Sequence, residues 1–250
     1  MSTNKVIKDK NVPINFLSML SSNDKYQYVF IVFYGAILYY VANMMKAKGV
    51  ALPQTLAFSG NGSKTLSVLS PNNETVAQFA SYIFEKVYGE KYADKKMKLD
   101  IIFDEQPKLA TCKGGIAHRN NLSFEAVEDI KVSLLGTNNT DMSDGYKYKQ
   151  IKTEQIKSVA DHVAHFIDFI FEINSQHNNF FVNYLAADAG LVNKVKDVCN
   201  SDLIEYTKQG LEKKFEELKS WGASEDTEVE ETLFFYPIVA MLSNLARQIK

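Results

Sequence analysis

The segment from Thr55 to Thr65, Thr-Leu-Ala-Phe-Ser-Gly-Asn-Gly-Ser-Lys-Thr, constrains the fold of this chain more than any other. Thr55–Phe58 is β-prone or apolar and lies between Pro53 and Gly60, which predicts a short buried strand. Gly60 and Gly62 then allow a ligand to come close to the main chain. Because open α/β sheets bind ligands at the carboxyl ends of their strands, the segment predicts a ligand-contacting loop.

The loop after this strand is rich in hydrogen-bond donors. Its predicted ligand contacts are Ser59, Gly60, Asn61, Gly62, Ser63 and Lys64. Main-chain amides and the Lys64 ammonium group would hold a phosphate. A P-loop is a weaker interpretation, because Phe58 and Ser63 occupy the positions of its two required glycines. A strand-to-helix turn that binds nothing is the other alternative, since glycine turns are common at such junctions.

The composition is that of a globular protein. The 250 residues allow one large domain or two small ones, and 46% of them are hydrophobic. A net charge of −2 gives no general attraction to nucleic acids or anionic lipids. Two cysteines, Cys112 and Cys199, fit a reducing compartment, and no apolar run follows the first residues. We therefore expect a cytoplasmic protein.

The stretch Tyr28–Met45 is almost uninterrupted apolar and predicts a helix from Lys25 to Lys48 that ends at Gly49. Its length is at the lower limit for crossing a bilayer. Its four tyrosines are spread along it, whereas a membrane helix gathers aromatic residues near its ends. We therefore expect a helix buried on all sides in a core, with a membrane-spanning helix as the less favoured alternative.

The next elements complete a predicted α/β core. Thr75–Tyr88 has apolar residues at spacings of three and four, which predicts an amphipathic helix. Leu99–Phe103 reads as a second buried strand, and Lys108–Ala117 as a helix that contains Gly114 and Gly115. Each glycine costs a helix about 1 kcal/mol relative to alanine. The pair therefore favours either close helix–sheet packing or close approach of a ligand.

The second half of the chain has a different character. Turn residues followed by the alternating segment Tyr146–Ile151 predict a two-stranded surface ribbon. Helical apolar spacing dominates after Thr153. The predicted organisation is an N-terminal arm (1–24), an α/β core (25–125), a surface β-ribbon (126–152) and a helical region packed on the core (153–250).

Other chemistry-bearing groups are weaker candidates. His162 and His165 have a spacing that zinc ligands can have, but no third strong ligand is in view. The acidic patch Glu225–Glu231 is read as a solvated loop, with attraction of a basic partner as the alternative. We identify no metal site and no catalytic residue.

The order of elements and motifs carries a family resemblance. The chain has, in order, a strand, Ser-Gly-Asn-Gly-Ser-Lys, a helix, a strand and Pro-Lys-Leu-Ala-Thr-Cys-Lys-Gly-Gly. This order resembles the later half of the nucleotide-binding core of the actin, sugar-kinase and heat-shock-chaperone ATPase superfamily. Phe58–Lys64 is similar to its adenosine loop, and Pro107, Ala110, Gly114 and Gly115 are similar to its following helix. The resemblance covers residues 28–118. It implies a small partly parallel sheet with flanking helices and, as ligand, ATP or ADP bound at Ser59–Lys64 and Gly114–Gly115.

The chain also departs from that family. We find no Asp-x-Gly phosphate hairpin before residue 55 and no carboxylate placed for metal binding or catalysis. The resemblance therefore implies a nucleotide-contacting part of a module that is not catalytic alone. An upstream half-module or a partner chain would complete its cleft. The alternative is a non-enzymatic interaction or scaffold domain that keeps the fold without binding nucleotide. We expect neither a nucleic-acid nor a membrane partner.

Overall fold

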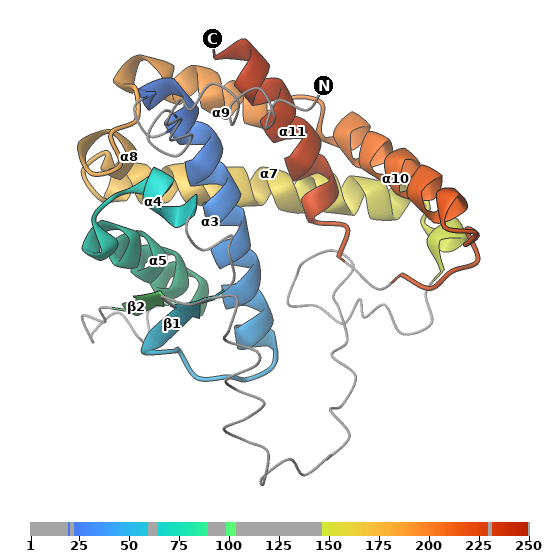
Figure 1. The fold of residues 1–250 in the computed structure, drawn as a ribbon, viewed down its shortest axis with the longest axis horizontal. Coiled ribbons are helices and arrows are strands. Elements are labelled where there is room, and N and C mark those ends of the chain that lie inside the picture. Colours follow the sequence, from blue (N-terminus) through green and yellow to red (C-terminus); the bar gives the residue numbers. More distant parts are fainter. Residues whose placement is uncertain are drawn as a thin grey trace, which may run out of the picture.

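The computed structural model describes residues 20, 23–59, 65–89, 99–103, 147–229 and 232–249. These residues are largely helical and include a two-stranded parallel sheet (Figure 1). The long helix α7 runs across the middle, with α10 near one end and α5 and α8 near the other (Figure 1). The predicted α/β class with a helical C-terminal region is therefore confirmed in its coarse form.

The described residues contain eight α-helices, two strands and two 3₁₀ turns. The helices are α3 (Asp24–Ala47), α4 (Leu66–Leu69), α5 (Asn73–Tyr88), α7 (Thr153–Gln176), α8 (Phe180–Asn183), α9 (Val192–Asn200), α10 (Leu203–Ser220) and α11 (Phe235–Gln248). The strands are β1 (Thr55–Phe58) and β2 (Asp100–Phe103), and the 3₁₀ turns are η3 (Tyr148–Gln150) and η4 (Ala189–Leu191). Helix α8 has only 4 residues. Asn178, Asn179 and Ala186 have positive φ angles of 57°, 50° and 54°, which interrupt a right-handed helix.

Helix α3 lies in the core. Its N-cap Asn23 accepts a hydrogen bond from the Lys25 amide at 3.1 Å, and the chain turns away at Gly49, where φ is +68°. The helix contacts α4, α5, α7 and α11. It is long and apolar enough to cross a membrane by length and composition, and half of its most apolar window is buried inside the protein. The expectation of burial on all sides is wrong, because Phe33 and Val41 are 41% and 37% exposed.

The sheet joins two strands through α4 and α5. Strands β1 and β2 pair in parallel, from Thr55 opposite Asp100 to Phe58 opposite Phe103. The Leu99 amide, just before β2, donates to Ser81 Oγ of α5 at 3.0 Å. The prediction that both strands are buried is wrong. Leu56, Phe58 and Ile101 pack against the core, whereas the alternate residues, such as Ile102 at 55% exposure, do not. One face of the strand pair therefore packs and the other is open.

The described residues form two apolar clusters. The larger one unites α3, α5, α7, α8, α9 and α11. The smaller one gathers Tyr148, Val159, Leu211, Leu218, Val229 and Leu233 around α7 and α10. Burial of Tyr148 explains why the predicted edge strand over Tyr146–Ile151 is wrong in its described part. Tyr148 is 2% exposed in a 3₁₀ turn, and the Gln150 amide donates to the Lys147 carbonyl at 2.9 Å. Residues 126–146 lie outside the described ranges.

Helices α10 and α11 are in close contact at Gly210. A Cβ atom there would lie 2.6 Å from Tyr236 Cβ and 3.2 Å from Tyr236 Cα. Alanine normally stabilises a helix by about 1 kcal/mol relative to glycine, but overpacking costs about 1–3 kcal/mol. We expect Gly210→Ala to lower the free energy of unfolding by about 1 kcal/mol in urea denaturation.

Gly35→Ala in α3 is the matched control for this prediction. There the new Cβ would meet the Cδ1 atom of Ile170 at 3.0 Å, which is the flexible end of a side chain. We expect a smaller loss because the Ile170 side chain can move. A Gly210→Ala protein as stable as wild type would show that the contact with Tyr236 is not tight.

Candidate functional site

The predicted ligand-contacting loop begins at the carboxyl edge of the sheet. Ser59 follows β1 directly and is exposed, and Phe58 pairs with Phe103 at the end of β2. The other predicted contacts, Gly60–Lys64 and Gly114–Gly115, lie outside the described residues. The structure therefore describes the point at which the loop leaves the sheet, and the other predicted contacts stay predictions.

The loop returns to the fold at Thr65, the residue before α4. The hydroxyl groups of Thr65 and Tyr34 of α3 are hydrogen bonded. Burial raises the pKa of Tyr34, and its hydrogen bond to Thr65 opposes that shift. Just after Thr65, Leu66 and Leu69 of α4 are buried in the larger apolar cluster. Both ends of the loop are thus attached to ordered elements, one to the sheet and one to the central helix.

The described residues contain no group of three or more His, Cys, Asp or Glu that could hold a metal ion. Of the two histidines considered from the sequence, His165 has its Nδ1 atom 2.8 Å from the Asp161 carbonyl one turn earlier. Cys199 is fully buried, and burial raises the pKa of its thiol to about 12. That thiol is therefore protonated near neutral pH and unsuited to nucleophilic chemistry. Cys112 lies outside the described ranges.

The described part of the acidic patch is linked to lysines. Asp226 pairs with Lys149 of η3 and lies 3.8 Å from the Lys147 Nζ atom. The hydrogen bond and charge of Lys149 lower the pKa of Asp226. Glu225 lies 3.7 Å from Lys219 Nζ. Both acids therefore have basic partners within the chain, and Asp226 connects the segment after α10 to η3.

Aromatic and charged groups join the last turns of α5 and α7. The rings of Tyr82 and His177 stack with centroids 3.5 Å apart, and Lys86 Nζ lies 2.9 Å from Glu172. Burial, and then the charge of Lys86, lower the pKa of His177. These contacts connect two helices, so we assign them a structural role.

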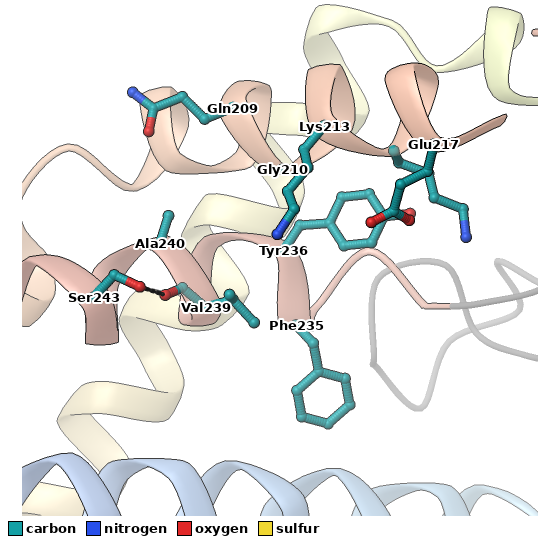
Figure 2. Close-up of a pocket in the computed structure, with 10 residues that line it drawn as sticks. Gln209, Gly210, Lys213, Glu217, Phe235, Tyr236, Val239, Ala240 and Ser243 are labelled. Atoms are coloured by element: carbon teal, nitrogen blue, oxygen red, sulfur yellow. Dashed lines mark hydrogen bonds between the residues drawn. The ribbon is translucent and has the colours of Figure 1, made fainter. Parts of the chain in front are cut away.

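A groove of about 460 Å³ lies between α10 and α11 (Figure 2). Its residues include Lys213, Lys214 and Glu217 from α10, and Phe235, Val239 and Ala240 from α11. No pattern in the sequence predicted this groove. Charged residues in the middle of α10 are ordinary for a surface helix. Predicting the groove requires knowledge of how α10 and α11 pack against each other.

Comparison with family models, with curated proteins and with solved structures yields no match for this chain. The candidate sites are therefore interpreted from the residues of the chain itself.

Proposed function

We propose that the chain is a nucleotide-contacting part of an actin-like ATPase module, which binds ATP or ADP and is not catalytic on its own. The observation that carries this proposal is the in-register parallel pairing of β1 and β2 through the α4–α5 connection. The Ser59–Lys64 loop leaves the carboxyl edge of that pair. In open α/β sheets this edge is where ligands bind.

The binding chemistry follows from the residue types in the loop. Main-chain amides made accessible by Gly60 and Gly62 would donate to phosphate oxygens, and Lys64 would add a charge-assisted hydrogen bond. The attachment of Thr65 to Tyr34 fixes one end of the loop, which reduces the conformational entropy lost on binding. An upstream half-module or a partner chain would supply the opposite wall of the cleft and the catalytic groups.

Calorimetric titration with ATP and ADP tests this proposal. We expect wild-type protein to bind, and Lys64→Ala to weaken binding by roughly tenfold or more, because a hydrogen bond to a charged group contributes about 1.5–3 kcal/mol. Lys48→Ala is the control, since this exposed lysine follows α3 and lies outside the loop. Absence of heat with wild type, or equal affinities for wild type and Lys64→Ala, would exclude the nucleotide site.

A hydrolysis assay tests the catalytic part of the proposal separately. We expect the purified chain to release no phosphate from ATP above the rate in buffer. Turnover that Lys64→Ala abolishes would make the chain an ATPase in its own right.

The second candidate function is a non-enzymatic interaction or scaffold domain. The groove between α10 and α11 favours this function, because Val239 is 57% exposed there. This apolar surface is accessible whether or not a nucleotide is bound. Wild-type protein that takes up no nucleotide would support this function over the first.

A further inference from the structure

A polar cleft of about 550 Å³ lies where α7 packs against α9, and its volume is in the size range of ligand-binding sites. Asp168, Glu172 and Ser175 line it from α7, where spacings of four and three place them on one helix face. Asn193 of α9 and Asn179, the residue before α8, also line the cleft. From Asp168 to Ser175 the helix rises about 10 Å, which is the length of about three residues of extended chain.

The buried lining of the cleft contains a hydrogen-bond donor without a partner. Asn174 lines the cleft and is only 3% exposed. Its Oδ1 atom accepts a hydrogen bond from the Phe181 amide at 2.8 Å, which fixes the orientation of the carboxamide group. The Nδ2 atom makes no hydrogen bond with any described residue and is not fully enclosed, so it is open to the cleft. Because an unpaired buried donor is unfavourable, the site favours a ligand that accepts a hydrogen bond here.

The charged groups that line the cleft already have partners. Lys196 Nζ of α9 lies 2.8 Å from the Asp168 carboxylate of α7. Glu172 lies 2.9 Å from Lys86 Nζ of α5 and accepts a hydrogen bond from Gln176 at 2.8 Å. An ionic ligand would have to compete with these pairs, so the contacts favour a neutral ligand.

The other lining groups indicate which neutral ligand fits. Asn179 and Asn193 are exposed, and neither side chain makes a hydrogen bond with the described part of the chain. A carboxamide offers the same donor and acceptor as a peptide group, so it can pair with both main-chain groups of an extended segment. A sugar would normally stack on an open aromatic ring, but Phe171, which lines the cleft, is only 6% exposed. These features favour a peptide main chain.

We propose that this cleft binds an extended, neutral segment of a partner protein through its main chain. Asn174 Nδ2 would donate to a main-chain carbonyl, and the carboxamides of Asn179 and Asn193 would pair with neighbouring peptide groups. Because the contacts are made to the main chain, the segment needs small or polar side chains without net charge, and not a particular sequence. The inference goes beyond the nucleotide site and does not depend on it.

The Asn174 side chain also provides the signal that tests the proposal. The probe is a capped hexapeptide of alternating serine and threonine, which has no charge and favours an extended chain. Nuclear magnetic resonance follows the side-chain amide signal of Asn174 in isotope-labelled protein. We expect a saturable shift with a Kd of about 1 mM, since a few hydrogen bonds give weak net binding. The same peptide with a fully N-methylated main chain should bind at least about fivefold more weakly, because it has no N–H donors.

Two variants test the residues that carry the proposal. Asn174→Asp keeps the acceptor for the Phe181 amide and removes the Nδ2 donor. We expect it to weaken binding about tenfold, as read from the side-chain signal of Asn193. Asn193→Ala should weaken binding about threefold or more by removing an exposed carboxamide. Asn200→Ala is its matched control, because Asn200 is exposed at the end of the same helix and does not line the cleft.

Circular dichroism verifies that each variant is folded. If Asn174→Asp does not fold, the comparison of Asn193→Ala with Asn200→Ala decides the matter. No shift of the Asn174 signal in wild-type protein, or equal affinities for Asn193→Ala and Asn200→Ala, would overturn the proposal. Tighter binding of maltose than of the peptide would also overturn it and assign the cleft to a carbohydrate.

Discussion

Replacing Phe166 by alanine is expected to lower the free energy of unfolding by about 3–5 kcal/mol. Phe166 lies on α7 and is fully buried. Its ring centroid is 5.3 Å from that of Tyr39 of α3 and 5.9 Å from that of Phe234, just before α11. The Phe166 side chain therefore fills the space where α7, α3 and the start of α11 meet in the larger apolar cluster. Truncation removes both the buried apolar area and the ring contacts, and it leaves a cavity.

Urea denaturation followed by far-ultraviolet circular dichroism measures this loss. Phe169→Ala is the matched control, because Phe169 lies on the same helix and also contacts Tyr39, with ring centroids 4.9 Å apart, but is only partly buried. We expect its loss to be no more than roughly half that of Phe166→Ala, since less apolar area leaves the core. Equal losses for the two variants would show that the α7 face assigned to the core is wrong.

The parts of this fold that were predictable are those encoded by local patterns. The apolar spacing in α5 and α7, the N-cap Asn23 and the stop at Gly49 each act within a few residues. The two strands were predictable from short apolar runs between turn residues. Parallel pairing was also expected, because the family resemblance implied a small partly parallel sheet.

The parts that were missed depend on contacts between distant segments. Alternation around Tyr148 is compatible with a strand, but its burial beside Phe215 of α10, with ring centroids 6.0 Å apart, favours a compact turn. Exposure of Ile102 could not be read from its apolar neighbours, because it depends on which sheet face meets the core. The groove at α10 and α11 arises from the approach at Gly210, which no local pattern encodes. The predicted contacts at 60–64 and 114–115 stay predictions.

Ala36→Lys is expected to prevent folding of the chain at 25 °C. Ala36 lies on α3 and is fully buried. An unpaired ammonium group in the core costs more than the 2–7 kcal/mol of an unpaired neutral polar group, and the stability of a typical domain is about 5–15 kcal/mol. Phe33→Lys is the matched control on the same helix, because Phe33 is 41% exposed and a lysine there can reach solvent. We expect that control to remain soluble and to lose about 1 kcal/mol.

The same pair of variants separates the core helix from a membrane-spanning one. The measurements are the soluble fraction after expression, circular dichroism, and recovery in the supernatant after carbonate washing of membranes. A core helix tolerates lysine at Phe33 and not at Ala36, because the Phe33 side chain reaches solvent and Ala36 is fully buried. In a bilayer the exposed face of α3 would meet lipid, where a central lysine costs about 2.5–3.5 kcal/mol. Wild-type protein retained in washed membranes, and released by Phe33→Lys, would therefore contradict the placement of α3 in the core of the protein.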